Sequence, residues 1–451
     1  MINLFTKSKL KTFTLGGLHI PDNKLSEKES IELVELPKMV QVPIAQHIGS
    51  PSEPVVKRGD KVKTGQLIAK STGSISANIH SSVTGTVAKL DDFLDTSGYK
   101  KPTIIIRTSE DDWADGIITD ESLDTEIKLS AEEIQQKIRE AGIVGLGGAT
   151  FPAHAKLADK NDPRHADLLL INGVECEPYL TADHRLMLEK PDEIIVGINI
   201  LKKALGVSKV VIGIESNKMD AVEILKKAAK PYSYIRVIAL KVKYPQGGEK
   251  QLIKAVTGKE VPNGKFPLDI GDVVYNVGTV YAIYEAIQKN KPLIRRVVTV
   301  TGKSLKKPSN FWVRIGTPIQ HLLDHVGGVP EDTAKVINGG PMMGKALKDF
   351  TIPVTKGTSG ILILPKSDAP RKNVQPCIRC SKCIDVCPMG LEPYLLMNLT
   401  EKVLIDRLNN EDVLNCIECG SCSYICPSGR PLLDYIRWGK SAVRKMKSNQ
   451  N

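Results

Sequence analysis

The sequence lacks long hydrophobic runs and any recognisable export signal. No stretch approaches the roughly 18 consecutive apolar residues of a membrane-spanning helix, and short runs such as GILIL at 360–364 are typical of buried strands. The opening segment MINLFTKSKLKTF is basic but has no apolar centre of the kind that a signal peptide requires. We therefore expect no membrane span and no signal peptide.

Aromatic residues are also scarce, at 5% of the chain, although the net charge is +11. The sequence has no zinc-finger or RNA-recognition signature, so the charge does not indicate nucleic-acid binding. A moderate positive charge instead fits an acidic protein partner or an anionic membrane surface.

Cysteine is nearly absent outside one region. Eight of the nine cysteines lie between positions 377 and 426, and the ninth is Cys176. Concentration in one motif, rather than in scattered pairs, indicates a reducing, intracellular compartment. We expect Cys176 to be an inert, buried side chain.

The eight clustered cysteines form two runs, PCIRCSKCIDVCP at 376–388 and NCIECGSCSYICP at 415–427. Each run is C-x2-C-x2-C-x3-C-P, which resembles the motif of bacterial two-cluster ferredoxins. In that motif three thiolates bind one [4Fe–4S] cluster and the fourth binds the other. Zinc sites and disulfides are the alternatives, but zinc usually takes two separated cysteine pairs. The expected ligands are Cys377, Cys380, Cys383 and Cys426 for cluster 1, and Cys416, Cys419, Cys422 and Cys387 for cluster 2.

The 28 residues between Cys387 and Cys416 have helical apolar spacing. This interval is long for a compact βαβ ferredoxin. We therefore expect an all-helical ferredoxin-type domain with two [4Fe–4S] clusters over residues 366–451.

The front of the chain, about 38–107, has short apolar runs separated by turn residues, which predicts a β-rich domain. Its segments GDKVKTGQLIAK (59–70) and SSVTGTV (81–87) resemble the barrel-sandwich hybrid of biotinyl and lipoyl carriers. Lys70 lacks the neighbours of a modified carrier lysine. We expect a structural barrel-sandwich domain over residues 1–110.

The middle of the chain alternates predicted strands and helices after an acidic linker at 111–126. Ser130 and Glu133 form a capping-box pattern that predicts a helix start. The strands 167–172, 209–216 and 234–242 alternate with helices 191–206 and 217–230. This order predicts a largely parallel sheet with ligands at the carboxyl ends of its strands, within an α/β domain over residues 127–290.

Three glycine-rich or polar segments border that sheet. GLGGATFPAHAK (145–156) follows a helix, so it is not the usual dinucleotide fingerprint, but its backbone could approach a phosphate that Lys156 would neutralise. The strand exits are 172–185, with NGVECEPYL, and 244–258, with YPQGGEKQLIKAVTG.

These segments, followed by VVYNVGT at 273–279, resemble in order the flavin- and NADH-binding subunit of respiratory complex I. The resemblance implies FMN and NAD(H) as cofactors, and it implies that Phe151 and Glu177 face the nucleotide. Lys265 and Phe266 are further candidates. Val174 and Gly248 stand where that family has acids. The site residues implied are Gly145, Gly147, Gly148, Phe151, Lys156, Asn172, Glu175, Glu177, Gly247, Gly248, Glu249, Tyr275 and Asn276.

Residues 291–365 combine short strands with one helix and resemble the soluble-ligand-binding β-grasp (SLBB) domain that follows the flavin domain in the same family. His321 and His325 are four residues apart on the expected helix. With no third ligand evident, we expect a partly exposed helix face rather than a metal site.

Taken together, these four parts define a multidomain α/β protein that resembles the RnfC family of Rnf electron transport complexes. The resemblance implies an oxidoreductase component that exchanges hydride between NAD(H) and FMN and relays electrons through the clusters. It implies integral-membrane and iron–sulfur subunits as partners, with ferredoxin acting indirectly. It also implies a peripheral position on the cytoplasmic face of the bacterial membrane. The alternatives are a soluble cobalamin reductase-like protein and a non-catalytic iron–sulfur relay.

Overall fold

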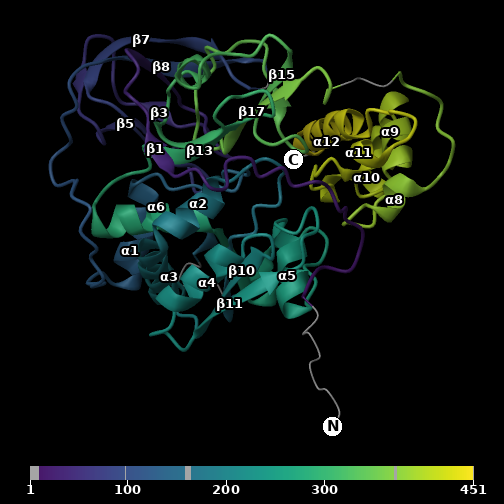
Figure 1. Cartoon of the computed structure of the whole chain (residues 1–451), viewed down its shortest axis with the longest axis horizontal. Coiled ribbons are helices and arrows are strands. Elements are labelled where there is room, and N and C mark those ends of the chain that lie inside the picture. Colours follow the sequence, from purple (N-terminus) through teal and green to yellow (C-terminus); the bar gives the residue numbers. More distant parts are fainter. Residues whose placement is uncertain (1–9, 97, 158–163, 370–372, 450–451) are drawn as a thin grey trace.

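The computed structural model describes residues 10–96, 98–157, 164–369 and 373–449 (Figure 1). The strands of these residues form four sheets, and the C-terminal part is helical. The expected multidomain α/β class is therefore confirmed. Among the residues described, no helix is both long enough and apolar enough to cross a bilayer.

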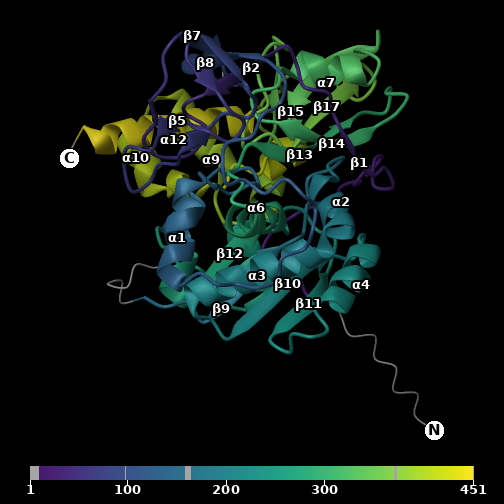
Figure 2. The ribbon, with the colours of Figure 1, turned by 90° about the vertical axis from the view of Figure 1, so that its left-hand side faces the viewer.

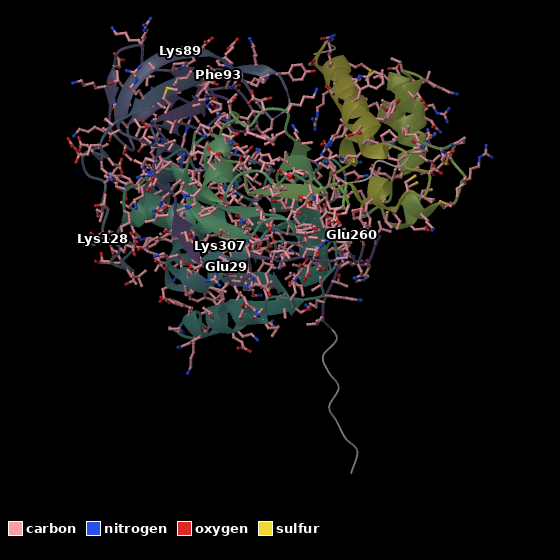
Figure 3. All side chains as sticks on the ribbon, turned by 45° about the horizontal axis from the view of Figure 1, so that its top comes forward. Glu29, Lys89, Phe93, Lys128, Glu260 and Lys307 are labelled. Carbon is pink, nitrogen blue, oxygen red and sulfur yellow. The ribbon has the colours of Figure 1, made fainter. Side chains whose placement is uncertain are left out.

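Two small sheets make up the front of the molecule. One has the order β2-β8-β7-β4 and the other β3-β5-β6, with a shared core of alternating aliphatic side chains between them. Lys89 and Phe93, labelled in Figure 3, lie on the long strand β7, with the Lys89 ammonium 5.2 Å from the ring centroid. The strands are β2 (Met39–Pro43), β3 (Glu53–Pro54), β4 (Lys61–Val62), β5 (Leu67–Lys70), β6 (Ile79–His80), β7 (Gly85–Leu94) and β8 (Lys100–Thr108).

The central domain contains a four-stranded parallel sheet in the order β11-β10-β9-β12. Helices α1, α3, α4 and α6 cover one face, and α5 covers the other (Figure 2). Both faces are therefore buried, which explains the near-continuous apolar strands. The strands are β9 (Leu168–Asn172), β10 (Lys209–Glu215), β11 (Ile235–Leu240) and β12 (Asp272–Asn276). The helices are α1 (Ala131–Glu140), α2 (Ala182–Glu189), α3 (Pro191–Leu205), α4 (Met219–Ala228), α5 (Glu249–Thr257) and α6 (Val277–Gln288), with 3₁₀ turns at η1 (Ala153–Lys156) and η2 (Pro267–Ile270).

The β-grasp domain is a six-stranded mixed sheet, β1-β14-β13-β17-β15-β16, with helix α7 (Ile319–His325) packed on it. Its edge strand β1 comes from the N-terminal segment and pairs in parallel with β14, Ile31 opposite Asn310. The strands are β1 (Ile31–Leu33), β13 (Arg295–Thr301), β14 (Ser309–Arg314), β15 (Thr333–Asn338), β16 (Lys345–Ala346) and β17 (Gly360–Pro365).

The C-terminal domain contains helices and no strand among its described residues, in agreement with the expected ferredoxin type. Its core joins aliphatic side chains of α9, α10 and α12 to cysteines of both motifs. In Figure 1 this domain lies beside β15 and α5. The helices are α8 (Lys382–Asp385), α9 (Pro393–Glu401), α10 (Ile405–Asn410), α11 (Ser421–Ile425) and α12 (Leu432–Ser448), with a 3₁₀ turn η3 (Val413–Asn415).

The N-terminal segment, residues 10–33, lies outside the two front sheets. Lys11 forms a bridge with Leu240 at the end of β11, and Leu18 forms one with Tyr244. This segment therefore crosses the central domain before β1 joins the β-grasp sheet, although we expected residues 1–110 to make up one domain.

Local signals predicted helices α1, α3, α4 and α7, whereas α5 and α6 were not among the expected elements. Helix α1 begins after Ser130, and both capping-box hydrogen bonds form with Glu133, at 3.2 and 2.7 Å. Helix α2 was not predicted, because its first-turn amides are capped from outside. Glu175 accepts from Asp183 N at 2.8 Å and from His184 N at 3.0 Å, a cap seven residues before the helix begins at Ala182.

A buried carboxylate joins the end of α6 to strand β13. Glu285 is 7% exposed and accepts from Arg295 at 2.6 Å and Lys291 at 3.2 Å. Burial raises the pKa of Glu285, but the charges of Arg295 and Lys291 outweigh burial and hold that pKa below its ordinary value. The ionised form is therefore the one that stabilises the fold.

Replacing this carboxylate by Glu285→Gln should lower the stability at neutral pH by roughly 3 kcal/mol, because two cations stay buried without their anion. The difference from wild type should shrink as the pH falls from the ordinary pKa of glutamate through the lower pKa of Glu285 in the folded state, where the wild-type carboxylate also becomes protonated. Thermal unfolding over a pH series measures both. Glu223→Gln, an exposed glutamate on α4, is the matched control, and a pH-independent difference would contradict the ionic explanation.

Candidate functional site

The glycine-rich loop runs from the end of α1 to the turn η1 and leaves its backbone open. Residues 147–149 are exposed, and Gly148 has φ +111°. A Cβ atom at Gly148 would meet no heavy atom within 4 Å, whereas one at Gly147 would lie 3.4 Å from Asn276 Cβ. The loop therefore offers bare peptide groups on one side and lies against the end of β12 on the other.

Lys156 holds its ammonium at the carboxyl edge of the sheet. Its Nζ lies 2.6 Å from Glu249 Oε1 and 2.9 Å from the carbonyl oxygen of Val274, and 5.8 Å from the centroid of Tyr275. Lys156 and Glu249 keep 28% and 39% of their side-chain surface exposed. Because both remain reachable, an anionic ligand here could share the ammonium with Glu249.

Two strand exits that are distant in sequence meet at this edge. The Asn172 amide donates to the carbonyl oxygen of Gly247 at 2.8 Å, and its side-chain oxygen accepts from Val174 N at 3.2 Å. Tyr275 is buried and donates to the carbonyl oxygen of Ala153 at 2.7 Å, which ties β12 to the turn that contains Lys156.

Acidic side chains gather on the α2 side of the same edge. Asn276 caps α6 through its oxygen and donates to Asp183 Oδ2 at 2.7 Å. Burial raises the pKa of Asp183 to about 7, and the negative charge of Glu175 adds to the shift. Sequence reasoning missed Asp183, because helix α2, whose second residue it is, was not predicted.

Glu177 contacts the β-grasp domain. Its carboxylate accepts from the amides of Met342, at 3.2 Å, and Met343, at 2.8 Å, in the GGPMMG loop of the β-grasp domain. Burial raises the pKa of Glu177 to about 7. Of the other candidates, Phe266 is 64% exposed.

The two departures from the complex I flavin motif have local packing explanations. A Cβ at Gly248 would lie 2.4 Å from Gln251 Oε1, so this helix start has little room for a side chain. Val174 is fully buried, and its carbonyl oxygen accepts from the buried Lys218 at 2.9 Å.

Lys24, from the N-terminal segment, organises the loop that follows β9. Its ammonium donates to the carbonyl oxygens of Glu175 at 2.8 Å, Glu177 at 2.9 Å and Leu180 at 2.6 Å. Burial lowers the pKa of Lys24 to about 8. The sequence contained no signal for this contact, because the two partners are more than 150 residues apart.

The motif cysteines group across the two runs. Burial raises the pKa of the Cys416 thiol to about 11 and also raises the pKa of Cys419 and Cys422, and the nearby Cys387 raises all three further. Burial raises the pKa of Cys383, and Cys426 and Cys377 add to that shift. Cys387 lines a small cavity together with Cys416, Cys419 and Cys422 of the second run, which is the grouping that crossed ligation predicts for cluster 2.

The second group faces the central domain. Tyr244 donates to the carbonyl oxygen of Cys419 at 2.7 Å, and Cys176 accepts from Gly247 N at 3.3 Å. Cys419, Tyr244 and Cys176 share one apolar cluster with Met342. By contrast, Cys377 and Cys380 of the first group are exposed.

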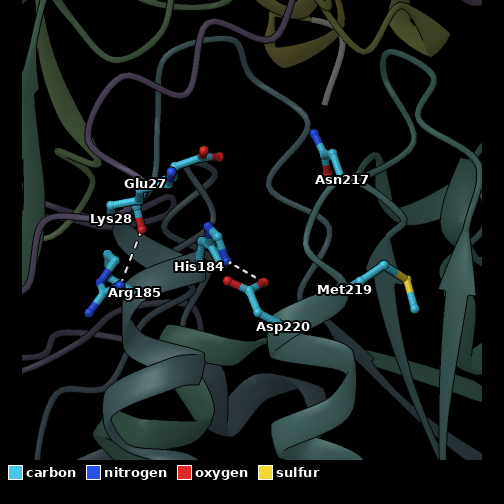
Figure 4. A pocket seen from close by; sticks show the side chains of 7 residues that line it. All are labelled: Glu27, Lys28, His184, Arg185, Asn217, Met219 and Asp220. Atoms are coloured by element: carbon cyan, nitrogen blue, oxygen red, sulfur yellow. Dashed lines mark hydrogen bonds and ion pairs between the residues drawn. The ribbon is translucent and has the colours of Figure 1, made fainter.

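A polar cavity of about 360 Å³ opens on the outer side of α2 and α4 (Figure 4). On its wall His184 Nε2 lies 2.9 Å from Asp220 Oδ1. No predicted flavin residue lines this cavity. The lining residues are Glu27, Lys28, His184, Arg185, Asn217, Met219 and Asp220.

The two helix histidines of the β-grasp domain have separate partners. His321 Nε2 lies 2.8 Å from the carbonyl oxygen of Glu35, and the His325 ring packs edge-on against Phe311 at 5.1 Å. Both contacts are structural.

Four family descriptions match consecutive parts of the chain. They are the RnfC barrel sandwich hybrid domain (11–111), the Nuo51 FMN-binding domain (138–285), the SLBB domain (297–346) and the 4Fe-4S dicluster domain (369–427). These matches agree with the fold described above.

Among solved structures, an NAD+-reducing [NiFe]-hydrogenase in the air-oxidized state is similar, with a TM-score of 0.50 and 17% identity. The match covers 70% of this chain and 66% of that one, and it shows a shared fold only.

Curated relatives match over nearly the whole chain. The C subunit of the proton-translocating ferredoxin:NAD(+) oxidoreductase complex of Clostridium ljungdahlii is 47% identical, covering 96% of this chain and 94% of that protein. Its counterpart in the Na(+)-translocating complex of Acetobacterium woodii is 43% identical, covering 95% and 96%. The chain therefore belongs to the RnfC family of ion-translocating ferredoxin:NAD(+) oxidoreductase (Rnf) complexes.

Proposed function

We propose that this chain binds FMN and two [4Fe–4S] clusters and connects NAD(H) to a chain of one-electron carriers in a larger complex. FMN, when bound, exchanges a hydride with NAD(H) and passes electrons singly to iron–sulfur clusters. The protein's own contribution is to bind and orient these groups and to set the distances between them.

One observation carries this proposal: the loop after β9 contacts both candidate cofactor regions. At its start Asn172 contacts Gly247 in the candidate flavin site, and four residues later Cys176 lies in the apolar cluster that contains Cys419. A loop of a few residues thus extends from the candidate flavin site to Cys419, a proposed ligand of an iron–sulfur cluster. This short path suits electron transfer between the flavin and that cluster.

The residues at the sheet edge fit FMN by their chemistry. The exposed amides at Gly147 and Gly148 and the ammonium of Lys156 are suited to a phosphate. Asn276, Glu249 and Asp183 supply hydrogen-bonding groups around it. Of the other residues that the resemblance implied here, Gly145 N donates to the carbonyl oxygen of Phe151 at 2.8 Å, Tyr275 donates to the carbonyl oxygen of Ala153, and Glu175 caps α2.

The cysteine groups fit two clusters, each with four thiolates. Cys387 with Cys416, Cys419 and Cys422 would hold the cluster that lies against Tyr244 and the central domain. Cys377, Cys380, Cys383 and Cys426 would hold the other. Because Cys377 and Cys380 are exposed, this outer cluster is suited to exchange electrons with a neighbouring protein of the complex.

We infer that the partners include integral-membrane and iron–sulfur subunits of the same complex, with ferredoxin reaching this chain only through them. The net charge of +11 supports attachment to an acidic partner or an anionic surface. We place the chain peripherally, on the cytoplasmic face of the membrane.

Two other functions are less well supported. A cobalamin reductase-like protein would be expected to begin near the glycine loop, and the front domain and the family matches favour the Rnf complex instead. Val174 and Gly248 suggested a relay without flavin, but both positions have packing explanations that leave Lys156 and the glycine loop intact.

The direct test is to purify the chain with reconstituted clusters, titrate it with FMN, and assay NADH-dependent reduction of an artificial acceptor. The proposal expects FMN binding and FMN-dependent NADH oxidation. Absence of binding at micromolar FMN would exclude the dehydrogenase function and leave the relay.

Substituting the phosphate-binding candidate by Lys156→Ala should weaken FMN binding by at least about tenfold, because one charge-assisted hydrogen bond is lost. Iron content should stay at the wild-type level, since the cysteine groups do not contact Lys156. Fluorescence titration and iron analysis measure the two quantities. Lys227→Ala, an exposed lysine on α4, should change neither. A parallel loss of flavin and iron would mean misfolding instead.

Crossed ligation makes a separate prediction for the iron–sulfur domain. Cys387→Ser or Cys426→Ser should reduce iron below the about four atoms that one intact cluster holds, because each residue ties one motif to the other's cluster. Cys176→Ser, a cysteine outside the motifs, serves as the matched control and should keep full iron content. Retention of one complete cluster in both motif variants, seen by electron paramagnetic resonance, would contradict this mutual dependence of the two clusters.

A further inference from the structure

The hairpin between β5 and β6 of the front domain, residues 71–78, docks on the central domain. In biotinyl and lipoyl carriers, which this domain resembles, the corresponding turn carries the modified lysine. Here Asn78 donates from its amide to the carbonyl oxygen of Glu140, the last residue of α1, at 3.0 Å. A Cβ at Gly142 would lie 2.1 Å from the carbonyl oxygen of Asn78, so only glycine permits this approach. The hairpin thus contacts residues 140–142, which connect the end of α1 to the glycine-rich loop.

A buried lysine of the β-grasp domain binds both sides of this contact between the hairpin and the central domain. Lys356 is 1% exposed, and its ammonium donates to the carbonyl oxygens of Asn78 at 2.8 Å and Gly142 at 2.7 Å. Its backbone amide donates to Gln46 Oε1, in the front domain, at 3.0 Å. None of the ion pairs among the described residues includes Lys356. Burial lowers the pKa of Lys356 to about 7, so its side chain contributes hydrogen bonds to this contact rather than one half of an ion pair.

The rest of the loop is also held from outside its own domain. The carbonyl oxygen of Leu146 accepts from the buried Arg296 of β13 at 3.2 Å. The carbonyl oxygen of Thr150 accepts from Ile48 N, in the front domain, at 3.4 Å. His154, in the turn that contains Lys156, lies 3.2 Å from the carbonyl oxygen of Ser74 in the docked hairpin. The front and β-grasp domains therefore contact the loop before, within and after its glycines.

We propose that the 71–78 hairpin and Lys356 form a clamp that positions the glycine-rich loop for the phosphate of FMN, with Asn78 and Lys356 as positioning residues. This inference rests on the proposed FMN site. It assigns a role to the carrier-like domain: its turn is a fixed support for the cofactor loop and not a mobile arm. Asn78 and Lys356 contact the backbone carbonyl oxygens of Glu140 and Gly142, so the two residues act through backbone placement.

The test uses the full-length, cluster-containing protein with Lys356→Met, which keeps the length of the side chain and removes both hydrogen bonds. The dissociation constant for FMN should rise roughly tenfold, as expected for loss of about two buried hydrogen bonds. At saturating FMN the rate of NADH oxidation should return to the wild-type value, because no group that touches the reactants is changed. Hydrogen–deuterium exchange of residues 142–156 should be faster in flavin-free protein.

Ser82→Ala is the matched control. Ser82 joins the front domain to the β-grasp domain through the carbonyl oxygen of Ile315, away from the glycine loop. This variant should leave both FMN affinity and exchange of residues 142–156 unchanged. An equal effect of both substitutions would overturn the clamp in favour of general domain docking.

Asn78→Ala provides a second variant if Lys356→Met does not fold, since Asn78 is only half-buried. Wild-type exchange and wild-type FMN affinity in a folded variant would overturn the proposal. The exchange measurement needs no flavin. If the wild-type chain fails to bind FMN, the proposed function fails, but faster exchange in Lys356→Met still supports the clamp and unchanged exchange still refutes it.

Discussion

A single buried ammonium group, that of Lys24, fixes the loop on which both halves of the electron path depend. Three carbonyl oxygens of this loop point at one nitrogen, and the side chains between them point in different directions. Glu175 caps α2, Cys176 meets Gly247, and Glu177 reaches the β-grasp domain. Without that ammonium group the three carbonyl oxygens would be buried and unpaired. The loop could then not hold Glu175, Cys176 and Glu177 in their separate contacts.

The domains are therefore arranged around shared contacts and not simply joined end to end. The GGPMMG loop illustrates this: Glu177 accepts from its amides, while Gly420 of the second cysteine motif lies close to the carbonyl oxygen of Met342. Arg437 of α12 donates to the next carbonyl oxygen, that of Met343, at 3.2 Å. This loop of the β-grasp domain therefore contacts both Glu177, in the loop after β9, and the second cysteine motif, next to the direct contact between Tyr244 and Cys419.

The parts of the structure that could be predicted are those that depend on a repeated spacing or order of residues close together in the sequence. The cysteine spacing predicted the grouping of Cys387 with the second run, and parallel strand order brought Asn172 and Asn276 to one edge. What could not be predicted depends on distant segments. Lys24 and Lys356 look like ordinary surface lysines in sequence, because their partners lie between 150 and 280 positions away. The partners of the Glu177 carboxylate likewise lie in another domain, in the GGPMMG loop.

The strand β1 gives this architecture a consequence for biosynthesis. Ile31 pairs with Asn310. Strand β1 therefore has no partner strand until nearly three hundred further residues have left the ribosome. Residues 10–33 must meanwhile cross a central domain that does not yet exist when they emerge. The nascent chain consequently carries an unpaired strand for most of its synthesis, and its domains cannot mature strictly from first to last.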